Sequence, residues 1–284
     1  MISSNLGYLY YKEYYTNKFI EECKLLGKKY DEKNTPLKNK NMEIIQNSNV
    51  SLYYNDKFNF INDIQDNLYE DKLNFKTTYP GVIIGTGYNH IIKETGEFKL
   101  GLEFDYTTGL PVINGSSVKG MIRSVFYNEK DDKDLKKQKE FYIKDILKKL
   151  VGENYLKKMS LKELTDNIFE GKSVGQSMPI NKKDIFFGAT ISIEKTIREM
   201  NREKNGENLL GVDYITPHGE KKEKLNPIKF LKVMPNVVWC FGFDLKKYDE
   251  IITSDIKKNL FKQILLDLGI GAKTNVGYGR LEEI

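Results

Sequence analysis

The stretch that decides the fold lies near the middle of the chain and reads Leu110-Pro111-Val112-Ile113-Asn114-Gly115-Ser116-Ser117-Val118-Lys119-Gly120-Met121-Ile122-Arg123. It opens as a short apolar run and turns at Asn114-Gly115. After the turn, apolar residues recur at helical spacing: Val118, Met121, Ile122 and Val125. This spacing predicts an amphipathic helix from about residue 117 to residue 126. We expect Ser116 or Ser117 to cap this helix by accepting a hydrogen bond from a free backbone N–H.

A helix start that follows glycine is suited to binding an anion, because free N–H groups and the helix dipole both favour negative charge. Lys119 and Arg123 are four residues apart, so they share one face of the helix and would add positive charge there. The pattern predicts an anion site built from Asn114, Gly115, Ser116, Ser117, Lys119 and Arg123. An ordinary loop-to-helix junction with two solvated basic residues explains the same pattern, and this alternative stays open.

The composition permits nucleic-acid binding without requiring it. The 284 residues can form one elaborated domain or two small ones, and 45 Lys and Arg against 40 Asp and Glu give a net charge of +5. Cys23 and Cys240 form no disulfide framework or zinc motif, and two histidines cannot build a histidine-rich metal centre. We therefore expect no metal and no cofactor. The chain begins with no signal pattern and has no apolar run of about 18 residues, so we expect a cytoplasmic protein without membrane contact.

The first 75 residues predict an extension that packs on the body of the protein or on a partner. Residues 1–20 are rich in Tyr and Leu and predict a short helix or strand. Residues 21–47 are rich in Lys and Asn, with Pro36 as the main breaker, and predict a segment that includes a mobile connection. Residues 50–75 alternate aromatic residues with Asn and Asp and give no clear pattern.

Three β-branched or aromatic runs predict buried strands, at residues 79–87, 184–193 and 237–245. A second amphipathic helix begins near Ser254, its expected cap. Its expected apolar face comprises Ile256, Leu260, Phe261, Ile264, Leu265 and Leu268. The charged segment 129–170 predicts inserted surface helices, whose expected apolar face comprises Phe141, Ile143, Ile146, Leu147 and Leu150.

The resulting order of strands and helices predicts an α+β fold of the ferredoxin-like (RRM-like) type, with both core helices on one face of an antiparallel sheet. We expect this fold to form one domain over residues 76–284. Insertions interrupt it at about 129–180 and at about 196–232, the latter a polar excursion too long for an ordinary hairpin loop.

The last sixteen residues contain four glycines that need a physical reason, because each glycine raises the entropic cost of ordering the chain. Gly269 is expected to end the second helix. The others are interleaved with polar, basic and aromatic residues, in a loop that would let backbone amides approach a phosphate chain. The predicted contact residues are Gly271, Lys273, Thr274, Asn275, Gly277, Tyr278, Gly279 and Arg280.

With this loop in place, the chain resembles the RAMP proteins of CRISPR effector complexes, and among them the sixth subunit of the Cmr (type III-B) group. The matching blocks run in the family's order over about two-thirds of the chain, residues 82–281. They are Gly85-Thr86-Gly87 with His90, Glu94-Thr95-Gly96, residues 109–120, Ile185-Phe186-Phe187, Asp213 with Thr216-Pro217-His218, Asn226-Pro227-Ile228 with Phe230, and residues 271–280. Two positions depart from the pattern: Asn114 stands where proline is common, and Gly188 where an acidic residue is common.

The resemblance implies a glycine-rich loop that closes a ferredoxin-like fold, and a subunit that holds guide RNA near its 3′ end without cutting it. It implies contacts with crRNA and target RNA, with a neighbouring RAMP backbone subunit and with the small subunits. The excursion at 196–232 would be the family's thumb-like insertion, and His218 would contact RNA.

Two enzyme hypotheses remain beside this one. Asp105 stands near the position of the aspartate with which related backbone subunits cut target RNA, but one carboxylate alone makes a poor metal site. His90 or His218 could act as a general acid or base in guide processing, although neither has an obvious partner in the sequence. A P-loop and a Rossmann motif are both absent. A subunit that touches only neighbouring proteins is a third possibility.

Overall fold

The computed structural model describes residues 5–13, 36–57, 60–85, 97–98, 102–202, 208–215 and 227–284. The α-helices are α1 (Leu6–Tyr11), α3 (Pro36–Asp56), α4 (Phe60–Leu68), α5 (Gly115–Ser124), α6 (Lys133–Val151), α7 (Glu153–Leu156), α8 (Leu161–Thr165), α9 (Ile193–Arg202) and α10 (Ser254–Leu268). The strands are β1 (Asp71–Thr77), β2 (Ile113–Asn114), β3 (Lys172–Ser173), β4 (Gln176–Ser177), β5 (Ile185–Ile191), β6 (Leu210–Ile215), β7 (Ile228–Val233), β8 (Val238–Asp244) and β9 (Leu281–Glu283). Short turns of other helix types are η2 (Asp166–Glu170), η3 (Ile180–Lys182) and η4 (Thr274–Val276).

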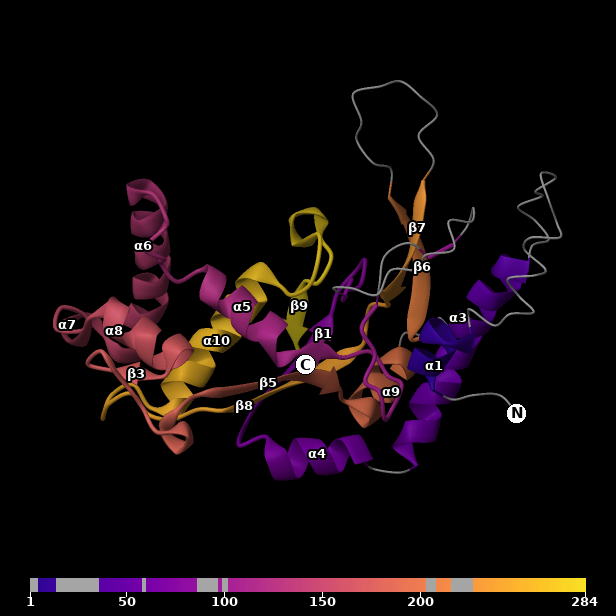
Figure 1. Ribbon diagram of the computed structural model, residues 1–284, viewed down its shortest axis with the longest axis horizontal. Helices are drawn as coiled ribbons and strands as arrows, with labels where there is room; N and C mark the ends of the chain where they lie inside the picture. Colours follow the sequence, from indigo (N-terminus) through magenta and orange to yellow (C-terminus); the bar gives the residue numbers. More distant parts are fainter. Residues whose placement is uncertain are drawn as a thin grey trace, which may run out of the picture.

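The centre of the molecule is a five-stranded sheet in the order β2-β5-β8-β1-β9, in which every neighbouring pair is antiparallel (Figure 1). Apart from the short β2, the core follows the chain order β1, α5, β5, β8, α10, β9. This is the strand, helix, strand, strand, helix, strand succession that the sequence predicts. The α+β fold class is therefore confirmed.

Helices α5 and α10 cover the same face of this sheet, as predicted. The ring of Phe186 on β5 lies between them, with its centroid 5.5 Å from that of Phe261 on α10 and 5.8 Å from Lys119 Nζ on α5. Phe75, Phe241 and Phe243 bury their rings on this face, which makes an aromatic core under the two helices.

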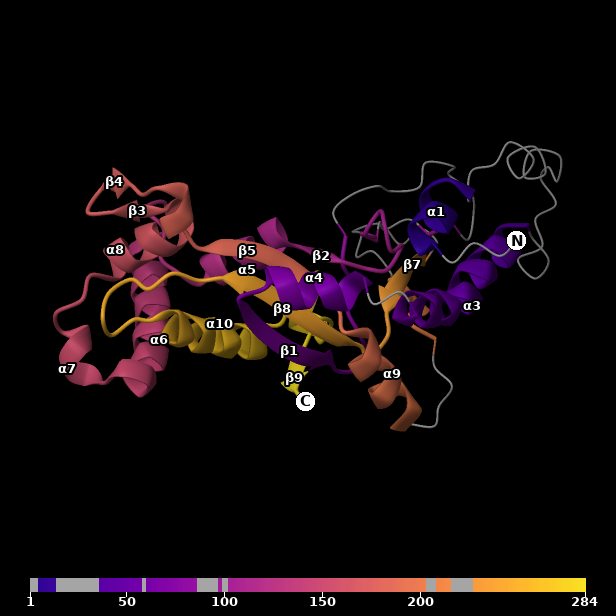
Figure 2. The same cartoon turned by 90° about the horizontal axis from the view of Figure 1, so that it is seen from below.

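Helix α4 covers part of the opposite face, as the view from below shows (Figure 2). Gln65 on α4 donates hydrogen bonds to Thr190 Oγ1 (2.9 Å) and to the carbonyl of Ile191 (3.3 Å). Tyr69, which follows α4, stacks on Phe187 and lies so close to Gly242 that a Cβ there would come within 2.4 Å of its ring. These contacts tie the segment before β1 to β5 and β8.

The first core strand is not where the sequence analysis places it. The strand expected at 79–87 is wrong over residues 79–85, the part that the structure describes: the first core strand is β1. Among these residues the buried Val82–Ile84 make one isolated bridge, between Val82 and Val233. β1 alternates buried and partly buried residues because it faces α10 on one side only. The sheet therefore begins at Asp71, before the predicted boundary at residue 76.

Four local expectations, two about helix ends and two about helix faces, also need correction. α5 begins at Gly115, and neither Ser116 nor Ser117 is its cap; the cap residue is Asn114, which makes no side-chain capping bond. α10 is capped by Thr253, whose hydroxyl accepts from the Ile256 N–H, and not by Ser254. On α6, Ile143, Ile146 and Leu147 are buried and Leu150 partly so, whereas Phe141 is 74% exposed; Leu268 at the end of α10 is also exposed.

The described part of the N-terminal region packs on the body of the protein. α1 buries Leu6, Leu9 and Tyr10, as its Tyr- and Leu-rich sequence predicts. Within the segment 21–47, which is expected to include a mobile connection, the residues from 36 onward form the start of α3, and residues 21–35 lie outside the described residues. Ser48 and Asn49 on α3 accept hydrogen bonds from the backbone of Leu210 and Leu209, so α3 supports the start of β6.

The predicted insertions are helical or hairpin structures attached to the core. The first contains α6, α7, α8 and the short β3–β4 hairpin, and α6 packs against α10. The second contains the described part of the β6–β7 hairpin, which stands above the sheet in Figure 1. Within the described ranges, no helix combines the length and the apolar character needed to cross a membrane.

A buried ion pair joins the first insertion to the core. Lys257 Nζ on α10 lies 2.6 Å from Asp184 Oδ2, just before β5, and 3.0 Å from Asn167 Oδ1 in η2. Both charged side chains are only 1% exposed. Burial raises the pKa of Asp184 despite the opposing attraction of Lys257. Removing one partner would leave the other charge buried without compensation.

We predict that Lys257→Ala lowers the free energy of unfolding by about 3–5 kcal/mol, because Asp184 loses the charge that compensates its burial. Urea denaturation of the purified chain measures this. The matched control is Lys247→Ala, which removes an exposed ion pair with Glu250 and should leave the midpoint nearly unchanged. Equal effects of the two substitutions would contradict the importance of the buried pair.

Candidate nucleic-acid interface

The closing loop, residues 269–280, runs from the end of α10 to β9 and is held by backbone hydrogen bonds to the segment after β1. The N–H of Gly279 donates to the carbonyl of Gly81 (2.8 Å), and the N–H of Ala272 donates to that of Ile83 (3.0 Å). A third bond closes the loop on itself, from the Ile270 N–H to the Gly279 carbonyl (2.9 Å). These three backbone bonds fix the shape of the loop.

The sequence predicts that the glycines of the loop let backbone amides approach a phosphate chain, but the structure shows that they let the loop approach protein backbone. A Cβ on Gly279 would lie 1.8 Å from the Ile270 carbonyl oxygen, and one on Gly271 would lie 2.5 Å from that of Ile83. Both residues also have positive φ, as does Gly277, whose surroundings are open. The glycines therefore allow the loop to pack on protein backbone. The N–H groups of Ala272, Val276, Gly277 and Gly279 already donate to backbone carbonyls.

The outer side of the loop is the part that a ligand can reach. Gly271, Asn275 and Arg280 are exposed, and Lys273 and Thr274 are partly exposed. Among the described residues, neither Lys273 nor Arg280 has an ion-pair partner. Two cations with no such partner are thus held on a loop of defined shape.

Tyr278 is tied to the β6–β7 hairpin, which limits the stacking role predicted for it. Its hydroxyl donates a hydrogen bond to Asp213 Oδ2 (2.6 Å), and the same oxygen accepts a hydrogen bond from Lys232 Nζ (2.9 Å). Burial raises the pKa of Asp213, but the hydrogen bonds from Tyr278 and Lys232 outweigh it, so the net pKa is lowered. Burial and the bond to Asp213 raise the pKa of Tyr278 above its ordinary value. The cluster locks the closing loop to the hairpin.

Tyr79, which the sequence analysis does not single out, is the exposed aromatic beside this cluster. Its side chain is 83% exposed, and Lys232 Nζ lies 6.0 Å from its ring centroid and 5.9 Å from that of Tyr278. The turn that carries it is fixed by the bonds from the Gly81 N–H to the Thr78 carbonyl and from the Thr78 N–H to the Arg280 carbonyl. A tyrosine just before a Pro-Gly turn is the sequence signal that could have identified it.

The start of α5 is placed by two glycines that face each other across β2 and β5. A Cβ on Gly115 would lie 2.0 Å from the Phe186 carbonyl oxygen, and one on Gly188 would lie 2.2 Å from that of Ile113. No side chain fits at position 188 in this chain. This explains why glycine stands there in place of the acidic residue that the resemblance leads us to expect. Asn114 and Ser116 are exposed at this junction, and Gly115 and Ser117 partly so.

The two basic residues of α5 differ in their surroundings. The Arg123 guanidinium pairs with Glu170 and lies 5.6 Å from the ring centroid of Phe169, so it helps to attach η2. Lys119 forms no ion pair within the described chain and lies over the ring of Phe186. Lys119 is therefore the cation of the pair that no carboxylate neutralises within the described chain, although a contact with RNA remains a prediction for both.

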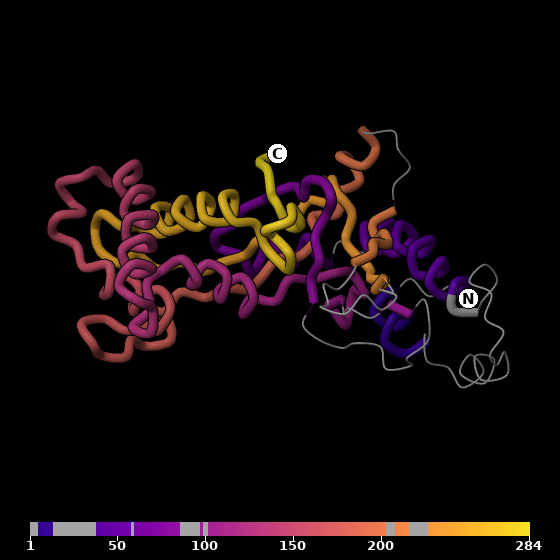
Figure 3. The backbone as a smooth tube through the Cα atoms, turned by 90° about the horizontal axis from the view of Figure 1, so that it is seen from above, coloured from indigo at the N-terminus to yellow at the C-terminus, as the bar shows by residue number. Residues whose placement is uncertain are grey.

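The closing loop and the start of α5 lie on the same side of the molecule. Figures 1 and 3, which view it at right angles, both place the loop beside α5. Backbone bonds connect the two regions stepwise: Ala272 to Ile83, Glu103 to the Ile84 carbonyl (3.3 Å), and Val112 to the Glu103 carbonyl (3.2 Å). We call the outer side of the closing loop, Tyr79 and the start of α5 together the loop face.

The predicted catalytic candidates have other surroundings. Asp105 Oδ1 accepts from the N–H groups of Thr107 (3.1 Å) and Thr108 (2.7 Å) and from the Thr108 hydroxyl (2.8 Å), so this carboxylate shapes a turn. His90 and His218 lie outside the described residues. Within the ranges that are described, no three Asp, Glu, His or Cys side chains gather in a way that could hold a metal ion.

Comparison with known proteins gives the following similarities. The family model of the RAMP superfamily matches residues 74–282. A chain of the cryo-EM structure of the type III-B Cmr-beta bound to cognate target RNA has a TM-score of 0.48 and 18% identity, over 98% of this chain and 95% of that one. The crystal structure of Cmr6 from Pyrococcus furiosus has a TM-score of 0.39 and 24% identity, over 75% of this chain and 97% of that one. No curated protein is significantly similar to the chain.

We predict that Gly279→Ala destabilises the protein by about 2 kcal/mol or more, because a left-handed backbone position and a clash with Ile270 coincide there. Thermal and urea unfolding measure the change. Gly120→Ala is the matched control: its Cβ would meet nothing within 4 Å, so helix propensity should stabilise the protein by about 0.5–1 kcal/mol. A neutral Gly279→Ala would contradict the packing described for the closing loop.

Proposed function

The chain belongs to the RAMP superfamily, and from this premise we propose that it is a non-catalytic RNA-binding subunit of a type III-B CRISPR (Cmr) RNA-targeting complex. In this role it scaffolds the complex near the 3′ end of the guide and contacts the guide–target RNA. Its protein neighbours are a RAMP backbone subunit and the small subunits.

The observation that carries this proposal is the loop face itself. Residues about 150 positions apart, at the start of α5 and in the closing loop, are exposed on one side of the sheet. Lys119, Lys273 and Arg280 on this face have no ion-pair partner among the described residues. Unpaired cations held at fixed positions are suited to a phosphate backbone.

The side chains of the loop face are suited to binding an RNA strand without preference for its base sequence. Cations neutralise phosphates, and the exposed ring of Tyr79 offers a face on which any base can stack. Base pairing between guide and target would then supply the sequence specificity, as in other RNA-guided systems.

The turn-forming role of Asp105 supports the absence of a cutting site at that position. Three donors already converge on one oxygen of the Asp105 carboxylate, so its structural role in the turn accounts for the residue without a catalytic function.

We predict that the purified chain leaves repeat RNA and guide–target duplex intact, with or without divalent metal, as judged by denaturing gels. Cleavage that His90→Ala or Asp105→Asn abolishes would favour the ribonuclease alternative.

We predict that Lys273→Ala and Arg280→Ala each weaken binding of the full chain to oligouridylate and to an unrelated RNA by the same factor. Each should reduce the slope of log affinity against log salt by about 0.7, because one phosphate contact is lost. Filter binding over a salt series measures both quantities. Lys247→Ala, on an exposed pair with Glu250 away from the loop face, is the control. A sequence-selective loss with an unchanged slope would refute the phosphate role.

We predict that Tyr79→Ala weakens RNA binding by about 1–3 kcal/mol while Tyr79→Phe binds as the natural chain does, because stacking needs the ring and not the hydroxyl. The same filter-binding assay measures this. Since the side chain is 83% exposed, both variants should keep the natural melting temperature. If Tyr79→Ala bound RNA normally, the loop face would have no stacking site at this position.

A further inference from the structure

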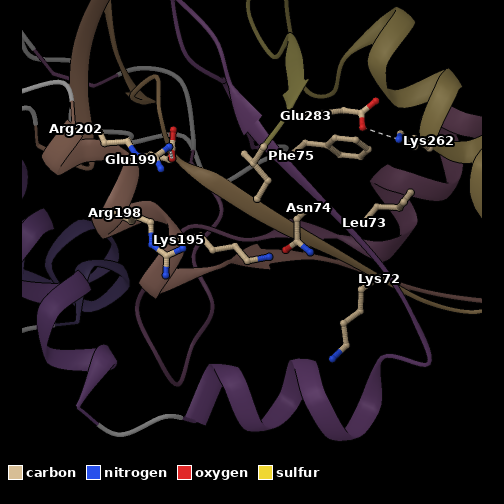
Figure 4. A pocket seen from close by; sticks show the side chains of 11 residues that line it. Lys72, Leu73, Asn74, Phe75, Lys195, Arg198, Glu199, Arg202, Lys262 and Glu283 are labelled. Carbon is tan, nitrogen blue, oxygen red and sulfur yellow. Dashed lines mark hydrogen bonds and ion pairs between the residues drawn. The ribbon is translucent and has the colours of Figure 1, made fainter.

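A hollow of about 500 Å³ lies beside β1, away from the loop face (Figure 4). Four consecutive strand residues, 72–75, line it together with α9 side chains, Lys262 of α10 and residues 283–284. Neighbouring strand residues point to opposite faces of a sheet. The lining joins Lys262 of α10, on the Phe75 face of the sheet, to Lys72 and Asn74, which point to the other face, so the hollow passes the edge of the strand. We call it the β1 hollow.

The edge of β1 in this hollow has no strand beside it. β8 pairs with β1 from Asp71 to Lys76, but on the other side β9 pairs only with Phe75 to Thr77. Within the described chain, residues 71–74 therefore have a neighbour on one side only. An unpaired edge presents a row of N–H and C=O groups that can pair with another extended chain.

The alternation along β1 identifies the main-chain groups that face outward. The Thr77 N–H donates to Val237, and the Thr77 carbonyl accepts from Asn236, so Thr77 faces the β8 side. The Thr78 N–H donates to Arg280 on the β9 side. Counting back in steps of two, the N–H and C=O groups of Asn74 and Lys72 point to the open side.

Basic side chains outnumber acidic ones around this open edge. Five basic and two acidic side chains line the hollow: Lys72, Lys195, Arg198, Arg202, Lys262, Glu199 and Glu283. Figure 4 shows the Lys195 side chain extending toward that of Asn74. Lys195 has no ion-pair partner among the described residues, and the Arg198–Glu194 pair is more than half exposed, so both cations can turn to an incoming anion at small cost.

We propose that the β1 hollow receives an extended acidic segment of a protein partner, which adds as a strand to the free edge of β1. Main-chain bonds to Lys72 and Asn74 align the segment, and its carboxylates contact Lys195 and Arg198. This is the strand-addition mode of peptide recognition, in which the backbone supplies affinity and side chains supply specificity. The site is separate from the loop face and independent of the RNA-binding proposal.

A protein segment fits the hollow better than RNA does. RNA has no amide backbone to match the outward N–H and C=O groups of a strand edge. Single-stranded RNA sites also combine phosphate contacts with aromatic stacking. The aromatic residue of the lining is Phe75, which is 1% exposed and points to the α10 side of the sheet, so it offers no stacking face.

Fluorescence anisotropy with the full chain tests the proposal, using blocked decapeptides of alternating Glu-Thr, Glu-Pro and Lys-Thr. We expect Glu-Thr to bind at least tenfold tighter than the other two, because only it combines negative charge with a backbone that can pair. Lys195→Glu should weaken Glu-Thr binding at least tenfold and leave binding to oligouridylate unchanged, while Lys247→Ala should change neither.

Asn74→Pro tests the main-chain contact directly, since it removes one outward N–H and no bond to β8. It should weaken Glu-Thr binding while the circular dichroism spectrum stays native. If this variant does not fold, a Glu-Thr peptide methylated on alternate backbone nitrogens gives an equivalent test, because it removes the peptide's own N–H donors to the edge of β1. Equal binding of Glu-Pro and Glu-Thr, or loss of oligouridylate binding in Lys195→Glu, would overturn the proposal.

Discussion

The structure depends on the backbone contact between the closing loop and the segment after β1. The Gly279 N–H bonds the Gly81 carbonyl, and Gly279 itself has no room for a side chain against Ile270. This contact brings the end of the chain to the turn that carries Tyr79. The bond between Tyr278 and Asp213 then adds the β6–β7 hairpin. Without these contacts the cations of the loop would have no defined position relative to α5.

The elements in which apolar residues recur at a regular spacing could be predicted from the sequence. The elements whose burial depends on tertiary contacts could not. α5 and α10 lie close to their predicted ranges because each has one apolar face against the same aromatic core. β1 gives a weak signal, because polar residues such as Lys72 and Asn74 occupy its less buried face. The apolar run Val82–Ile84 resembles a strand in sequence, but it is buried by the closing loop, whose contact no local pattern encodes.

The candidate site could be predicted in its location more than in its chemistry. The glycine-dense end of the chain does form an ordered, partly exposed loop, yet Gly271 and Gly279 serve protein packing. Among the basic residues, sequence spacing cannot distinguish Arg123, which Glu170 neutralises, from Lys119, which has no ion pair in the described chain. The loop face is therefore defined by the cations that form no ion pair. Whether a cation is paired depends on acidic residues that are distant in the sequence, as Glu170 is from Arg123.

The most direct measurement is ultraviolet crosslinking of uridine-containing guide RNA to this subunit in the assembled ribonucleoprotein, with the crosslinked peptides identified by mass spectrometry. The account predicts crosslinks at Tyr79 and in the peptides that contain the closing loop and the start of α5. Crosslinks confined to α4 or to the β1 hollow, with none in residues 271–280, would contradict it.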